Sequence, residues 1–120
     1  MYNYIRDDHP NEDFIGTRVV KEDGSLGQFE YETYKTIIDK GDAFGSGIKY
    51  LDLCPVVNDY QDFHCRFLSV FAPNMPMWYT MDIGAMIHGL TLAPLYNTLG
   101  PDSISYVLNQ TRTQTLCLHS

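Results

Sequence analysis

The chain has 120 residues, of which 44% are hydrophobic and 13% aromatic, and a formal net charge of −7 at pH 7. This length allows one small domain, and the composition is that of a folded protein rather than of a disordered segment. The acidic balance argues against nucleic acid and anionic membrane surfaces as partners, because both are bound through concentrated Lys and Arg.

Residues 1–27 are predicted to be an irregular lead-in, because glycines interrupt a polar stretch that has no hydrophobic period. A short strand is expected at residues 29–31, and Thr33 then suits the N-cap of a helix. Gly45 and Gly47 weaken the last turn of that helix and are expected to help end it. Apolar and small residues at helical spacing form one face of the helix: Tyr34, Ile37, Ile38, Gly41, Phe44, Gly45 and Ile48.

The middle of the chain is predicted to hold a connector, a strand and a second helix. Residues 49–65 contain several turn formers and no period. Residues 66–71 are mostly apolar, which is typical of a strand buried on both faces. Pro76 can open the next helix at its first position, where a missing N–H costs nothing. That helix, residues 77–90, is apolar on nearly all sides, so we expect it to be packed on several of them.

Strands and helices continue to alternate toward the end of the chain. A strand is expected at residues 92–96, where Pro94 restricts it to an edge or a strand end. Pro101 starts a third helix, and residues 115–118 form the last expected strand. Alternation over residues 28–118 predicts an α/β fold with a partial parallel sheet and helices packed on it. Parallel strands are normally covered on both faces, so we expect the chain to be an incomplete part of a larger domain.

Cysteine usage and the apolar segments bear on where the protein works. The three cysteines are sparse and lack close spacing, which fits a reducing compartment. The first ten residues carry acidic side chains and no apolar run, so neither a secretory signal nor a mitochondrial leader is expected there. The longest apolar segment, residues 77–90, contains Asp82 and His88 and is shorter than the ~20 residues that a membrane span requires.

Four blocks of sequence, in order along the chain, carry a family resemblance. Residues 14–18 read F-I-G-T-R, against F-L-G-T-R in the family. Residues 31–34 and 45–48 read Y-E-T-Y and G-S-G-I, against W-x-T-Y and G-S-G-L. Residues 67–78 read F-L-S-V-F-A-P-N-M-P-M-W, against F-L-G-I-F-x-x-N-R-P-E-W, and residues 94–100 read P-L-Y-N-T-L-G, against P-L-Y-D-T-L-G. The chain therefore resembles the N-terminal part of the AMP-forming long-chain fatty acid–CoA ligases (long-chain acyl-CoA synthetases).

The resemblance runs from about residue 14 to residue 118, with some departures. Met75 and Met77 stand where the family usually has Arg and Glu, which could remove a local ion pair. Ser69 replaces a Gly, and Asn97 replaces an Asp. These departures indicate a divergent or decaying copy of the family pattern.

The resemblance implies an activity for the complete enzyme. Family members use ATP and Mg²⁺ to convert a fatty acid to an acyl-adenylate, from which coenzyme A displaces AMP. This chain contains neither the Ser/Thr/Gly-rich phosphate loop that ends in Pro-Lys, nor the adenine-binding T-E motif, nor the Lys-bearing lid. We therefore assign no catalytic, cofactor-binding or metal residue, and we expect ATP, Mg²⁺ and coenzyme A not to bind this chain alone.

The resemblance also implies the partners and the subcellular location of the protein. In the complete enzyme the partners would be a fatty acid and coenzyme A, and this segment could also pair with the remainder of its own domain. The expected location is the cytoplasm, or the surface of an intracellular membrane to which the protein attaches peripherally.

One positional argument identifies substrate-side candidates for a complete enzyme. In open parallel sheets, ligands bind beyond the carboxyl ends of the strands. The turns after the strands at 66–71 and 92–96 would lie nearest such a site. The candidates on these turns are Asn74, Tyr96, Asn97 and Thr98.

Other residues of suggestive type are given structural interpretations. Residues 41–49 lack the spacing of a phosphate loop and are expected to pack a helix through small residues. Ser46 lies directly between two glycines, which is not the nucleophile-elbow pattern, and His88 is expected to be a hydrogen-bonded core or boundary residue. The cluster of Asp62, His64 and Cys65 is expected to be a surface loop rather than a metal site.

Two functions are consistent with these observations. The first is an N-terminal part of a long-chain fatty acid–CoA ligase, inactive alone. The second is a non-catalytic interaction or scaffold module that retains the same fold.

Overall fold

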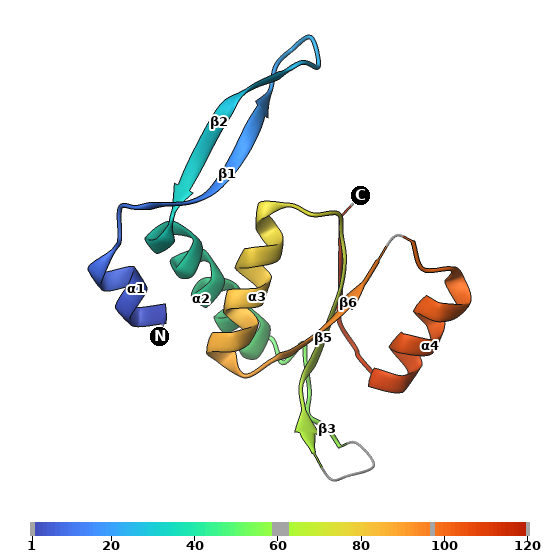
Figure 1. Ribbon diagram of the computed structural model, residues 1–120. Coiled ribbons are helices and arrows are strands. Elements are labelled where there is room, and N and C mark those ends of the chain that lie inside the picture. The colour runs from blue at the N-terminus through green and yellow to red at the C-terminus, as the bar shows by residue number, and fades with distance from the viewer. Residues whose placement is uncertain (1, 59–62, 97, 120) are drawn as a thin grey trace. The chain divides into compact units, whose positions relative to one another are not determined.

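The computed structural model describes residues 2–58, 63–96 and 98–119. The chain divides into two compact units, Met1–Lys40 and Gly41–Ser120, and each is described by itself (Figure 1). Helix α2 (Tyr34–Tyr50) begins in the first unit and ends in the second.

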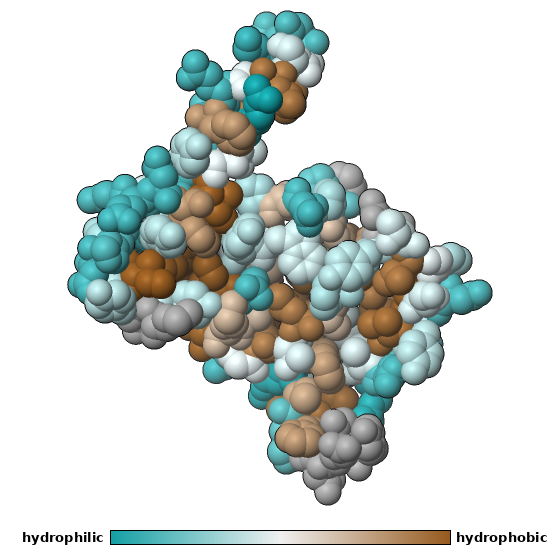
Figure 2. Space-filling model, viewed as in Figure 1, coloured by the Kyte–Doolittle hydropathy of each residue, from teal (hydrophilic) through white to brown (hydrophobic). Residues whose placement is uncertain are grey.

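The first unit consists of a short helix and a β-hairpin. Helix α1 covers Tyr2–Asp8, and strands β1 (Asp13–Val20) and β2 (Leu26–Thr33) pair antiparallel. The turn between the strands is closed by the Lys21 amide, which donates to the Ser25 carbonyl at 2.9 Å. Hydrophilic side chains cover this turn (Figure 2).

The prediction of an irregular lead-in at residues 1–27 is therefore wrong. The hairpin is held by cross-strand hydrogen bonds and not by a buried apolar face, so it has no hydrophobic period to read. Gly16 lies opposite Tyr31 in the ladder, and a Cβ there would come within 2.7 Å of Tyr31 Cε1. This glycine accommodates a close cross-strand ring rather than interrupting structure.

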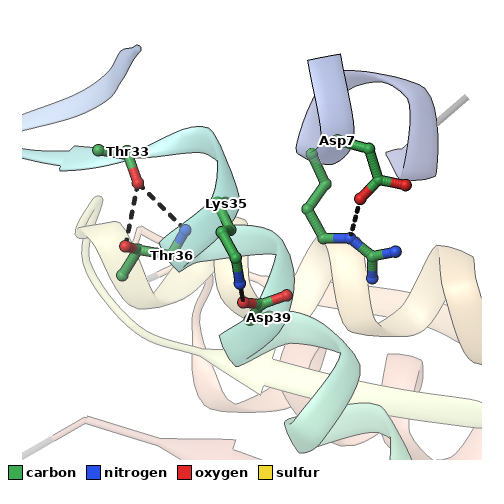
Figure 3. Close-up of polar contacts among 6 residues, drawn as sticks. Asp7, Thr33, Lys35, Thr36 and Asp39 are labelled. Carbon is green, nitrogen blue, oxygen red and sulfur yellow. Dashed lines mark hydrogen bonds and ion pairs between the residues drawn. The ribbon is translucent and has the colours of Figure 1, made fainter. Parts of the chain in front are cut away.

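Helix α2 begins where the sequence predicts. The Thr33 hydroxyl oxygen accepts a hydrogen bond from the Thr36 amide at 3.3 Å, which satisfies one of the free N–H groups of the first turn (Figure 3). Lys35 and Asp39 form an ion pair along the helix. The helix continues through Gly45 and Gly47, so these glycines do not end it as expected.

The second unit is built on three parallel strands in the order β6–β5–β7. Their bounds are Phe67–Phe71 for β5, Thr91–Leu95 for β6 and Leu116–Leu118 for β7. Helices α3 (Pro76–His88) and α4 (Pro101–Thr111) connect them and lie on opposite sides of the strands (Figure 1). Two very short strands, β3 (Val57–Asn58) and β4 (His64–Cys65), pair antiparallel within the predicted connector.

The predicted parallel sheet with packed helices is confirmed, with one correction. The strand expected at residues 29–31 belongs to β2, which pairs with β1 and not with the parallel sheet. The last expected strand does join the sheet, where Val70 lies opposite Cys117. Pro94 lies in β6 at an edge of this sheet, as its missing N–H requires.

The core of the second unit surrounds β5. Leu68, Ser69 and Val70 are each 0% exposed, as expected for a strand covered on both faces. The Ser69 hydroxyl has no hydrogen-bond partner among the described residues. The apolar cluster around this strand draws on α2, α3 and the following loops: Ile48, Cys54, Leu68, Val70, Met81, Ala85 and Leu90.

Candidate functional site

The carboxyl ends of the three parallel strands meet at one edge of the sheet. In the strand register, Phe71 lies opposite Leu95 on one side and Leu118 on the other. The segments that follow these residues therefore leave from the same edge. The substrate-side candidates lie on those segments, except that Asn97 falls outside the described residues.

A surface pocket of about 390 Å³ lies beside the start of α3 at this edge. The Trp78 ring is held by a hydrogen bond from its Nε1–H to the Ala72 carbonyl at 3.2 Å. Trp78 and Asp82 are four residues apart, which places both on one face of the helix. The lining residues are Asn74, Met75, Trp78, Tyr79 and Asp82.

Of the predicted candidates that the structure describes, only one lines this pocket. Asn74 lines it, whereas Tyr96, which is 61% exposed, and Thr98 are not among the lining residues. The pocket combines an amide, an indole face and a carboxylate, a set that suits a hydrogen-bonding or cationic group. The negative charge of Asp82 would repel the carboxylate of a fatty acid here. The four-residue spacing of Trp78 and Asp82 is the sequence signal that predicts their shared helix face.

A second pocket, of about 260 Å³, has a different chemistry. It lies between the start of α3 and β7, and no acidic residue, lysine or arginine is among its lining residues. Burial raises the pKa of the Cys117 thiol that borders it. The lining residues are Phe44, Ala72, Met75, Met77, Met81, Cys117, Leu118 and His119.

A histidine, an aspartate and a serine meet between α2 and α3 without forming a catalytic relay. His88 Nε2 lies 2.7 Å from Asp42 Oδ1 and 3.4 Å from Ser46 Oγ. Both oxygens approach the same ring nitrogen, whereas a nucleophile relay needs one partner on each nitrogen. His88 has a side chain only 16% exposed, and the structure confirms it as a hydrogen-bonded boundary residue.

Small residues let α2 and α3 approach closely in the second unit. A Cβ on Gly45 would lie 2.7 Å from the Gly84 carbonyl oxygen, and a Cβ on Gly84 would lie 2.5 Å from the Gly41 carbonyl oxygen. Residues 41–49 are therefore a helix-packing surface, as predicted, and not a phosphate loop.

Metal-binding groups of His, Cys, Asp and Glu are not assembled in the described part of the chain. No group of three or more His, Cys, Asp or Glu residues there could hold a metal ion. His64 Nδ1 instead lies 2.7 Å from Asn58 Oδ1, and Asp62 lies outside the described residues. The described residues therefore do not offer the carboxylate set that Mg²⁺ prefers.

The lengths and hydropathy of the described helices show whether any of them could span a membrane. None of them is both long enough and apolar enough to cross a membrane.

Comparison with known proteins identifies the relatives of this chain. No protein-family model matches it. A long-chain-fatty-acid–CoA ligase of Mus musculus is 32% identical over 81 residues, which cover 68% of this chain and 11% of the relative. A fatty acyl-CoA synthetase of Dictyostelium discoideum is 29% identical over 116 residues, which cover 97% of this chain and 16% of the relative. The chain is a relative of the long-chain acyl-CoA synthetases.

A solved structure supports the same assignment at the level of fold. The fatty acid AMP ligase of Legionella pneumophila superposes with a TM-score of 0.71 at 15% identity, over 99% of this chain and 19% of that one. The chain is thus an N-terminal segment of the AMP-forming adenylating-enzyme fold. It spans between 11% and 16% of the length of the two sequence relatives.

Proposed function

We propose that this chain is the N-terminal structural part of an ATP-dependent, AMP-forming acid–thiol ligase that acts on long-chain fatty acids. The observation that carries the proposal is that one of the four segments that resemble the family, residues 67–78, also contains β5, the central strand of the parallel sheet. In the whole protein the reaction would yield an acyl-adenylate and then an acyl-CoA.

The part assigned to this chain is structural rather than chemical. It would supply the β6–β5–β7 strands and the carboxyl edge beside which a nucleotide and acyl site is completed by other sequence. Asn74, Tyr96, Asn97 and Thr98 stay candidates for substrate-side contacts there, and of these Asn74 lines a pocket beside the start of α3. ATP, Mg²⁺ and coenzyme A would bind only the completed enzyme.

The location proposed with this function is the cytoplasm or the surface of an intracellular membrane. It is supported by Cys54, Cys65 and Cys117, which are free thiols, as expected in a reducing compartment.

A chimera tests the proposal. In it, this chain replaces the matching segment of the Dictyostelium discoideum relative, and acyl-CoA formation is measured with ATP, Mg²⁺, a long-chain fatty acid and coenzyme A. We expect turnover by the chimera and no pyrophosphate release above blank by the isolated chain. A matched chimera that carries Val70→Asp should be inactive, because it buries a charge in the centre of the sheet.

Two results would count against the proposal. A folded chimera without turnover would remove the ligase assignment. Robust pyrophosphate release by the isolated chain would remove the claim that it is inactive alone.

The alternative is a non-catalytic interaction module, favoured by the buried cluster that the second unit forms on its own. It predicts a cooperative thermal melt and a defined oligomer or partner for the isolated chain. The ligase-segment proposal predicts exposed apolar surface near β7, detected as dye binding and aggregation, because Leu118 is 68% exposed.

A further inference from the structure

The pocket between α3 and β7 has an unusual set of donor atoms. Five of its eight lining residues carry sulfur or imidazole nitrogen, and the other three are Phe44, Ala72 and Leu118. Oxygen ligands of the kind that hard cations prefer are missing from the lining side chains. The five donors are Met75, Met77, Met81, Cys117 and His119.

The five donors come from two segments of the chain, one at the start of α3 and one at the end of β7. On α3, Met77 and Met81 are four residues apart and therefore share a face of the helix. Cys117 on β7 and His119, directly after the end of β7, both line the pocket, as does Leu118 between them. The His119 amide donates to the Phe71 carbonyl at 3.2 Å, so the backbone of this segment stays hydrogen-bonded to β5 past Leu118.

The donor chemistry selects one class of ligand. Thioether and thiolate sulfurs prefer soft cations, and methionine in particular suits Cu(I), whereas Mg²⁺ and Ca²⁺ require oxygen. Phe44, Ala72 and Leu118 make up the rest of the lining. The pocket is also small, at about 260 Å³, so the flexible methionine side chains can converge within it.

From these observations we infer that the pocket between α3 and β7 binds one soft monovalent cation of the Cu(I) class. Met77, Met81 and Cys117 are the principal ligands, and Met75 and His119 complete the set. Binding exchanges the Cys117 thiol proton for the metal ion, so one proton is released for each ion bound. The inference does not depend on the proposed ligase function.

Packing alone does not account for all of these methionines. Met81 is 3% exposed and belongs to the core cluster, so it has a packing role. Met77, in contrast, is 50% exposed at the rim of the pocket. Leucine would serve packing equally well at both positions, which makes Met→Leu the substitution that separates ligation from packing.

The test is an anaerobic Cu(I) titration of the 120-residue chain in competition with a chromophoric Cu(I) chelator. We expect one Cu(I) per chain. The Met77→Leu/Met81→Leu double variant and the Cys117→Ala variant should each lose affinity by at least about tenfold, the lower bound seen when even an indirect partner of a metal site is lost. Fluorescence of Trp78 and circular dichroism verify that each variant is folded.

Control variants remove sulfur outside the pocket. Met86→Leu lies on the same helix and Cys65→Ser on β4, and neither residue lines the pocket. Both should keep the affinity of the unmodified chain. Copper K-edge absorption of the loaded chain should show sulfur scattering that is reduced in the Met77→Leu/Met81→Leu variant.

Three results would overturn the inference. The first is Cu(I) affinity that is unchanged in the folded Met77→Leu/Met81→Leu variant. The second is an equal loss of affinity in Cys65→Ser, which would place the ion elsewhere. The third is a failure of the unmodified chain to compete with the chelator at all.

Discussion

The β1–β2 hairpin and the parallel strands of the second unit are ordered by different forces. β5 buries three consecutive residues completely, whereas the hairpin leaves Val20, Leu26, Phe29 and Tyr31 more than half exposed. The hairpin depends on cross-strand hydrogen bonds and a tight turn, and the parallel sheet depends on side chains packed from two faces. A substitution that removes apolar volume should therefore damage one region and spare the other.

The largest expected effect comes from truncating the buried strand. Leu68→Ala removes a side chain that is 0% exposed, and it should lower the free energy of unfolding by roughly 2–5 kcal/mol. The matched hairpin change, Leu26→Ala, alters a side chain that is 56% exposed and should stay within about 0.5 kcal/mol. Urea unfolding followed by circular dichroism measures both. Equal losses would erase the contrast between the two regions.

The next effect tests the close approach of α2 and α3. Gly45→Ala would bring a Cβ within 2.3 Å of His88 Cδ2 and should cost about 1–3 kcal/mol through overpacking. Gly47, two residues along the same helix, has no heavy atom within 4 Å of such a Cβ, so Gly47→Ala should be neutral or stabilise by up to ~1 kcal/mol. Urea unfolding followed by Trp78 fluorescence distinguishes them, and destabilisation by both alanines would contradict the packing described.

A smaller effect, of opposite sign, is expected at Ser69. Its hydroxyl is fully buried and has no partner among the described residues, so Ser69→Ala should raise the free energy of unfolding by about 1 kcal/mol. Exposed Ser103 offers a control, and Ser103→Ala should leave stability unchanged. If Ser69→Ala destabilises the chain in thermal melts, the hydroxyl is bonded in solution.

The smallest effect concerns pH. Burial raises the pKa of the Cys54 thiol, so the folded chain holds this proton more tightly than the unfolded chain. The resulting stabilisation is fully present below the ordinary thiol pKa of about 8.5 and is lost as the pH rises through the folded-state pKa. Unfolding measured from neutral to alkaline pH should show this loss, and Cys54→Ala should reduce it. A pH dependence that is unchanged in Cys54→Ala would mean that other groups cause the alkaline loss.

The sequence predicts the second unit well because its signals are local. A continuous apolar run marks β5, and Pro76 and Pro101 each begin a helix. The sequence does not predict the hairpin, because a two-stranded ribbon with exposed faces has no hydrophobic period. The helix continues through Gly45 because the tertiary contact with α3 outweighs helix propensity. Gly47 makes no such contact, and nothing in its surroundings explains why the helix continues through it.

The candidate site was predictable only in outline. Strand topology alone placed the turn at Asn74 and the turn after β6 at one edge of the sheet, and the register of Phe71 with Leu95 confirms that edge. Which side chains share a pocket depends on packing between elements. The second pocket is the example, because Cys117 of β7 lines it together with methionines at the start of α3.

The central claim is that this chain forms the parallel β6–β5–β7 core of an adenylating-enzyme fold, and solution NMR tests it most directly. The account predicts nuclear Overhauser contacts that follow a parallel register, with Val70 flanked by Pro94 on one side and Cys117 on the other. An antiparallel pattern, or the absence of contacts between residues 69–71 and 116–118 in a folded sample, would contradict it.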